Sequence, residues 1–304
     1  MVFTHSGRCL SFENIVKSNL VYQYLPFKRL KDLLHVCFGL KLSEGTIFNT
    51  IQRTAGKGEQ LYESIKDFIA GSKVVGTDET VICVNGQKWY NWVWQNSKAT
   101  FIACEDSRRK ENITKYFPNG LPEAILVSDR YSSHLYTPAR GHQMCWSHLI
   151  RIIRYLMEAE DNPLPAKLLD IYKQAKHLEK LKSSLGNGSA KTRRLEKQLN
   201  DILLLDIDKD EFPKTAKLQN SLINHRDKIL TFIYHQDVPS HNNASEIAIR
   251  NAKVKMKISG CFKSCQHHFA VIRSIVDTLI KNKLPVFDNL FNLESGKSIN
   301  FNFS

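Results

Sequence analysis

The chain has 304 residues, of which 42% are hydrophobic and 24% charged, so it has the composition of a globular protein with a sizeable core. Its 43 Lys and Arg residues outnumber 30 Asp and Glu residues, and the formal net charge of +13 favours an anionic partner such as nucleic acid, although a basic surface kept for solubility would give the same balance. Seven scattered cysteines, no apolar run of membrane-spanning length and no signal peptide exclude a disulfide scaffold and a membrane protein, and predict a cytoplasmic protein.

Residues 1–70 are predicted to form a helical N-terminal module. Two segments with apolar periodicity lie between residues 24 and 55, separated at Gly39, and Ser43 is suited to cap the second helix. A helix, a short turn and a second helix resemble a helix-turn-helix, whose second helix enters the major groove of DNA. Two packed core helices would produce the same pattern, and the two interpretations have equal weight.

Residues 71–150 are predicted to alternate between strands and helices. Asn85-Gly86 is typical of a type I′ turn, and therefore predicts a hairpin between the strands on either side of it. Further strands are expected at 99–107, 123–129 and 141–146, with a short helix at 110–118. A helix capped by Ser147 follows. This order predicts an α/β fold with a mixed sheet flanked by helices.

Residues 151–236 have helical periodicity instead and interrupt the α/β pattern. Apolar residues recur every three or four positions from Leu164, the pattern breaks at residues 186–188, and it resumes at Leu195, which predicts an antiparallel helical hairpin with a basic tip. The tip carries Lys191, Arg193 and Arg194. Helical patterning of the core returns over residues 237–290, and residues 291–304 are a tail.

Three acids stand out by their context: Asp78 inside the first strand, Asp129 at the end of the fourth, and Glu246 on the helix after the insertion. A carboxylate inside a strand is costly unless it is hydrogen-bonded or bound to a cation. Acids on two strands and a covering helix can converge, and carboxylate oxygens suit Mg²⁺. Taken singly, the three residues are equally well explained as a satisfied strand residue, a turn former and a first-turn helix acid.

Six motifs in order make the chain recognisable: GTDET (76–80), WVWQ (92–95), SDRYSSH (128–134), CWSHLIR (145–151), NNASEIAIR (242–250) and KISGCFKS (257–264). Together they resemble the DDE transposases of the insertion-sequence 66 family over roughly residues 24–290. The resemblance implies an RNase H-like catalytic core in two parts, 71–150 and 237–290, around the helical insertion. It also implies that Asp78, Asp129 and Glu246 are the catalytic and metal-binding triad.

The same resemblance implies the reaction and the partners. The enzyme would cleave DNA at the ends of the element and join the freed 3′-hydroxyl to target DNA, with two Mg²⁺ ions, for which Mn²⁺ can substitute. The implied partners are double-stranded DNA at the terminal inverted repeats and at the target, further copies of the chain on that DNA, and element-encoded accessory proteins. A bacterial, nucleoid-associated location follows, and the insertion would position the ends or a second subunit.

Several residues near the acids are candidates for supporting roles. Cys145 and His148 match a Cys-x-x-His motif of related transposases. With the downstream cysteines and histidines a zinc site is conceivable, but the spacing is not that of a zinc finger, and we favour His148 as a neighbour of the acids or a DNA contact. Arg250 lies one turn after Glu246, and a basic run follows that suits DNA backbone contacts or a solvated helix face: Lys253, Lys255, Lys257 and Lys263.

The sequence also departs from the family. The lead before the helices is short and lacks the cysteine-rich segment of longer members, so we expect that segment to be lost or replaced. GCFKS replaces a glycine-rich stretch, and His267-His268 stand where smaller residues are usual. Two alternatives therefore stay open: an inactive remnant that binds element ends as a repressor, and an RNase H-like nuclease without strand transfer.

Overall fold

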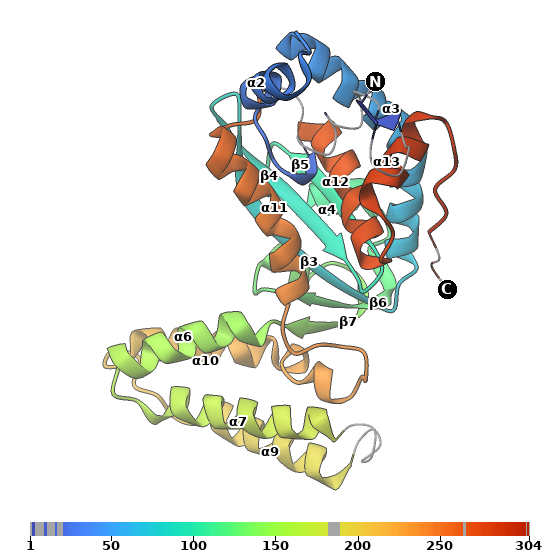
Figure 1. Cartoon of the computed structure of the whole chain (residues 1–304). Coiled ribbons are helices and arrows are strands. Elements are labelled where there is room, and N and C mark those ends of the chain that lie inside the picture. The colour runs from blue at the N-terminus through green and yellow to red at the C-terminus, as the bar shows by residue number, and fades with distance from the viewer. Residues whose placement is uncertain are drawn as a thin grey trace. The chain divides into compact units, whose positions relative to one another are not determined.

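The structure is a computed structural model that describes residues 2–3, 9–10, 16, 21–181, 189–263, 266–301 and 303 (Figure 1). It divides into two compact units. The first contains residues 1–72, 76–118 and 244–304, and the second contains residues 73–75 and 119–243. The chain therefore leaves the first unit after residue 118 and returns to it at residue 244. In the described part of the chain, no helix is both long enough and apolar enough to cross a bilayer.

A five-stranded mixed sheet has the strand order β5-β4-β3-β6-β7. Its strands are β3 (Val74–Val84), β4 (Gln87–Gln95), β5 (Thr100–Glu105), β6 (Leu121–Ser128) and β7 (Ala139–Met144). The first three are antiparallel neighbours, whereas β6 and β7 are parallel. The predicted hairpin is confirmed, because Asn85 and Gly86 have φ angles of 49° and 79° between β3 and β4. A separate two-stranded ladder pairs β1 (Val2–Phe3) with β2 (Cys9–Leu10).

Two faces of the β3–β5 sheet are buried by different partners. One face carries Trp92 and Trp94, whose rings stack at 5.9 Å between centroids, and Trp94 also packs on Phe117, just after α4 (Glu111–Tyr116). The other face carries Val93 and Ile102, which pack against α11 (Asn243–Ser259) and α12 (Gln266–Lys281). The alternation of side chains along β4 thus explains why a run of five consecutive residues is buried.

The helix α12 covers the edge of the sheet at β5. The hydroxyl of Ser274 accepts a hydrogen bond from the Ile102 N–H at 2.9 Å, and that of Thr278 accepts one from the Thr100 N–H at 3.2 Å. These bonds satisfy donors that an edge strand would otherwise present to another chain. α12 also packs against α3 (Glu44–Ala70), and α13 (Val286–Glu294) packs on both.

The N-terminal helices form as the sequence predicts. α2 (Phe27–Phe38) ends at Gly39, which has the left-handed φ of 66°, and α3 (Glu44–Ala70) begins at the cap Ser43, whose hydroxyl accepts the Thr46 N–H at 3.0 Å. Buried side chains follow one face of α3 from Ile47 to Ile69, so α3 is a core helix over its length. Its opposite face is polar and exposed at Asn49, Gln52 and Arg53. Both interpretations of this helix pair therefore keep structural support.

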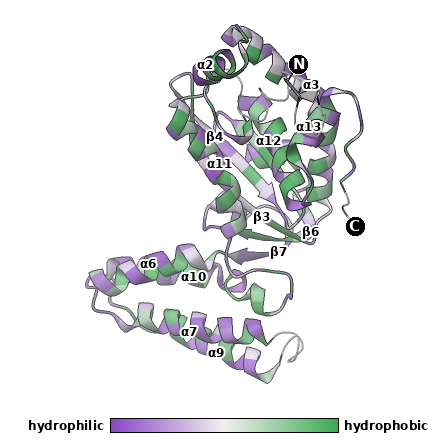
Figure 2. Ribbon diagram, viewed as in Figure 1, coloured by the Kyte–Doolittle hydropathy of each residue, from purple (hydrophilic) through white to green (hydrophobic). Residues whose placement is uncertain are grey.

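In the second unit, a helical layer follows β6 and β7. Its helices are α6 (Trp146–Ala159), α7 (Pro163–Lys180), α9 (Ala190–Leu203) and α10 (Pro213–Asn224). A short helix, α5 (Ser132–Leu135), lies between β6 and β7. Two 3₁₀ turns, η2 (Arg226–Lys228) and η3 (Thr231–Ile233), follow α10. α7 and α9 lie side by side (Figure 1), as expected for the predicted hairpin. The helices alternate between hydrophilic and hydrophobic residues (Figure 2), and their apolar faces share one core.

Three details of this unit differ from the sequence-based expectation or lie beyond it. Ser147 does not cap α6, because the helix begins one residue earlier and Cys145 takes the N-cap position. The predicted break at residues 186–188 lies outside the described residues. α10 has a cap that local sequence does not reveal: the Glu160 carboxylate accepts the N–H groups of Lys214 and Thr215 at 3.0 and 2.9 Å.

Candidate active site

Asp78 lies in the middle of β3 and is half-buried. Its carboxylate accepts the N–H of Glu79 at 2.9 Å. Asp78 is directly opposite Val93 of β4, and directly opposed residues of an antiparallel pair project to the same face of the sheet. Because Val93 packs against α11, Asp78 belongs to the face that α11 covers.

Glu246 lies in the first turn of α11 and is half-buried. Ile249, three residues later and on the same side of the helix, packs in one cluster with Val93. The start of α11 is also held to the sheet, because Gln95 of β4 donates a hydrogen bond to the Ser245 hydroxyl at 3.2 Å. The first unit therefore brings Asp78 and Glu246, 168 residues apart in the sequence, to the same face of its sheet.

Glu79 has a different environment from its neighbour Asp78. Its side chain points to the opposite face, is only 2% exposed, and forms an ion pair with Arg108. Its place opposite Trp92, whose side chain is fully buried, explains why the carboxylate is shielded from water. The sequence leaves the role of Glu79 open, and the structure gives it a salt bridge to Arg108 on the face of the sheet opposite to Asp78.

The basic residues after Glu246 fall into two groups. Arg250, Lys253 and Lys257 are exposed and recur at helical spacing on the side of α11 that also carries Glu246. Lys263, beyond the helix, is exposed as well. Lys255, by contrast, is 6% exposed and donates a hydrogen bond to the carbonyl of Leu25 at 3.2 Å, so the expectation that it contacts DNA is wrong.

Asp129 belongs to the second unit, where it follows the last residue of β6. Its carboxylate accepts the Tyr131 N–H at 2.9 Å, which shapes the turn into α5. In the order of the sheet, β6 is the neighbour of β3, and the first residues of β3 belong to the same unit as β6. That Asp129 forms one site with the two acids of the first unit, Asp78 and Glu246, stays a prediction.

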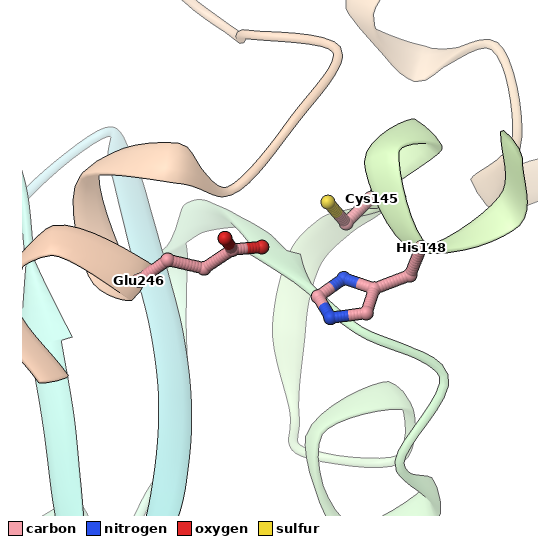
Figure 3. A group of neighbouring side chains, drawn as sticks. All are labelled: Cys145, His148 and Glu246. Carbon is pink, nitrogen blue, oxygen red and sulfur yellow. The ribbon is translucent and has the colours of Figure 1, made fainter. Parts of the chain in front are cut away.

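Cys145 and His148 project from the beginning of α6, and Glu246 projects from the beginning of α11 (Figure 3). Burial raises the pKa of the Cys145 thiol, but hydrogen bonds from His148 and from the Asn242 N–H, the latter at 3.2 Å, outweigh it and leave the pKa below its usual value. A thiol with a lowered pKa is a better metal ligand. A structural zinc site needs four ligands, however, and Cys145 and His148 account for only two of them.

The downstream cysteines and histidines contact separate partners in the first unit. Cys261 lies 3.0 Å from Cys83 between sulfur atoms, whereas His267 pairs with Glu59 at 2.9 Å and His268 packs edge-on against Phe48. Cys265 lies outside the described residues.

Sequence reasoning missed Gln95 as a positioning residue. Its amide nitrogen contacts Ser245 beside Glu246, and its oxygen accepts a hydrogen bond from Lys281 at 2.9 Å. It therefore ties β4 to both α11 and α12. The sequence did offer a signal for this role, because Gln95 is a polar residue at the end of the apolar WVWQ stretch. A buried amide needs hydrogen-bond partners, so its contacts with neighbouring elements could have been expected.

The fold and the acids define the class of protein. Three antiparallel strands, a helix and two further strands, followed by helices, are consistent with an RNase H-like α/β fold with helical parts, and one face of it carries two carboxylates beside exposed cations.

The comparison with known families is more specific. The chain belongs to the IS66 family of transposases, whose model matches residues 15–268, and this membership supports a transposase function and DNA as the partner. The match includes the first part of the predicted core, the insertion, and residues 237–268 of the second part. No curated protein matches the chain.

Proposed function

We propose that the protein is a DDE transposase that cleaves DNA at the ends of its element and joins the 3′-hydroxyl to target DNA, with Asp78, Asp129 and Glu246 as catalytic residues. The observation that carries the proposal is the placing of Asp78 and Glu246 on one face of the first unit's sheet, next to the exposed cations of α11, in a chain of this family. Asp129 is included because the family motif assigns it and because it ends the strand next to β3.

The donor set fits Mg²⁺ or Mn²⁺, because three carboxylates offer hard oxygen ligands and no thiol or imidazole is needed among them. Asp78 and Glu246 are half-buried, which suits ligands that must reach a bound phosphodiester. Two such cations, when bound, would activate a water or 3′-hydroxyl and stabilise the leaving oxygen.

The chain's own residues then hold the substrate. Arg250, Lys253 and Lys257 extend from Glu246 along α11 and are suited to bind successive phosphates of one strand, which would bring the scissile phosphate to the acids. The exposed face of α3 and His148 are further DNA contacts in this proposal. Assembly on two element ends requires at least two copies of the chain, with the accessory proteins that the element encodes.

The test is a strand-transfer assay with Mg²⁺ or Mn²⁺ on duplexes that carry the element's terminal inverted repeats. Asp78→Asn, Asp129→Asn and Glu246→Gln should each lower the cleavage rate about a thousandfold, because each removes several kcal/mol of charge stabilisation. The control is Glu111→Gln, which removes an exposed acid of the first unit and should leave the cleavage rate like that of the wild type.

The outcomes separate the alternatives. Cleavage without joining would replace the proposal with a nuclease, and binding without cleavage would replace it with a non-catalytic repressor. Unchanged cleavage in any of the three acid variants would remove that residue from the site.

A further inference from the structure

A groove in the second unit lies between α7 and α9 and has a volume of about 620 Å³. The two helices lie side by side, and hydrophilic residues alternate along both (Figure 2). Leu178 and the buried Leu195 form the apolar part of the lining. The remaining lining residues are polar or basic, so the groove has the character of a binding surface rather than of a defect in the core.

The lining of this groove has one sign of charge. Lys173 and His177 come from α7, and Lys191 and Arg194 come from α9; all four are exposed, and none of the described lining residues is acidic. Asp170, an exposed acid of α7 outside the lining, accepts a hydrogen bond at 2.7 Å from Gln174, a lining residue. Three permanent cations above an apolar floor attract an anion more strongly than they would in open water.

The spacing of the basic residues indicates an extended anion. On α9, Lys191, Arg194 and Gln198 follow one another at intervals of three and four, so they share one side of the helix. At 1.5 Å per residue they cover about 10 Å, close to the axial rise of about three nucleotides in one strand. α9 begins at Ala190, and its N-terminal dipole adds to the attraction at Lys191.

We propose that the α7–α9 groove binds the phosphate backbone of duplex DNA. This inference rests on the proposed function and assigns a second DNA contact, in the insertion, to the same enzyme. A duplex is favoured over a single strand or a free nucleotide because the described lining residues include no Phe, Tyr or Trp, whereas recognition of unpaired bases relies mainly on stacking against such rings. Backbone binding without base contacts would hold DNA of any sequence in place.

The experiment measures binding of a short fluorescent duplex by the full chain at several salt concentrations. The test variant is Lys191→Gln/Arg194→Gln, which lowers the net charge from +13 to +11. The control is Lys167→Gln/Lys197→Gln, which makes the same charge change at exposed positions of α7 and α9 outside the groove. The test variant should weaken binding about tenfold or more and reduce the log–log salt slope by about 2. The control should weaken binding less than about threefold.

The outcomes are decisive in each arm. Equal weakening by the two double variants would overturn the groove as a site, as would tighter binding of a single strand than of the duplex. If free ATP displaced the duplex at concentrations at which other salts do not, the groove would be reassigned to nucleotides. Thermal unfolding of both variants shows whether the helices stay folded, and Lys173→Gln, on α7, provides an independent probe from the facing helix.

Failure of this inference is distinguishable from failure of the proposed function. Binding requires no cleavage, so a protein that binds duplex through the groove but never cuts it refutes only the catalytic proposal. A protein that cleaves normally while both double variants bind like the wild type refutes only the groove.

Discussion

Lys281 lies half-buried at the end of α12, where its ammonium group donates hydrogen bonds to three oxygen atoms of the first unit. They are Gln95 Oε1 at 2.9 Å, the Asn96 carbonyl at 2.6 Å and the Ala99 carbonyl at 2.8 Å. Burial lowers the pKa of Lys281 to about 7 from 10.5, although the charge of Asp277 opposes the shift. The charged form is therefore disfavoured in the folded state relative to the unfolded chain.

This shift predicts a pH dependence of stability. Between pH 7 and pH 10.5 the unfolded chain binds more protons at Lys281 than the folded one, so the free energy of unfolding should rise with pH. The contribution is fully present above pH 10.5, is lost as the pH falls towards 7, and amounts to at most about 1.4 kcal/mol per pH unit. Denaturant unfolding at several pH values measures it.

The control for this prediction is Lys281→Met, which removes the titrating group. The variant should be less stable overall, because three acceptors lose their donor, but its stability should rise less steeply with pH. Parallel pH curves for the two proteins would show that Lys281 keeps its ordinary pKa when folded.

The limits of sequence-based prediction are clear for this residue. Lys281 ends an apolar helical pattern and is indistinguishable in sequence from an exposed lysine in the last turn of a helix. Its burial depends on Gln95, 186 residues away, and such a contact has no local signal. Lys255 was misjudged for the same reason. Asp78, by contrast, could be singled out from its strand alone.

At the scale of elements, α3 and α12 of the first unit pack closely against each other at Gly58. A Cβ atom added at Gly58 would lie 2.8 Å from Ile275 Cδ1 and 3.4 Å from Val271 Cγ1. Gly56, one half-turn earlier on the exposed side of α3, has no atom within 4 Å of such a Cβ. The two glycines therefore separate the effect of helix propensity from that of packing.

We predict opposite effects for alanine at these two positions. Gly56→Ala should raise the free energy of unfolding by about 1 kcal/mol, because alanine is the better helix former. Gly58→Ala should gain the same propensity but lose about 2 kcal/mol to overpacking, for a net loss of about 1 kcal/mol. Denaturant unfolding of the three proteins measures both changes. Equal stabilisation by the two substitutions would mean that α12 yields without cost.

Elements were more predictable than their partners. The hairpin at Asn85-Gly86, the cap at Ser43 and the end of α2 at Gly39 depend on neighbouring residues, and they form as expected. The cap of α10 by Glu160 depends on a side chain 54 residues away, and at the start of α6 the N–H of Trp146 donates to the distant carbonyl of Ser240 at 3.0 Å. Local chemistry thus specifies most element boundaries here, and tertiary contacts specify the rest.

At the scale of the whole molecule, the net charge of +13 draws DNA to the protein, and the proposed acids oppose it locally. Asp78→Asn/Glu246→Gln raises the charge to +15, since two carboxylates are lost. If both carboxylates face bound DNA, they repel its phosphates. The double variant should then bind duplex about threefold to tenfold more tightly than the wild type in the presence of a chelator. Fluorescence anisotropy measures this without any need for cleavage.

Position, rather than total charge, must cause the effect, and a matched variant tests this. Asp67→Asn/Glu111→Gln also brings the charge to +15, but it alters exposed acids elsewhere in the first unit. It should tighten binding less than about twofold, because exposed charges far from the ligand are screened by salt. Added Mg²⁺ should then narrow the gap between the wild type and the Asp78/Glu246 variant, since a cation held by the carboxylates neutralises them. Equal tightening by both variants, or a gap that Mg²⁺ leaves unchanged, would place the two acids away from the DNA and contradict their catalytic role.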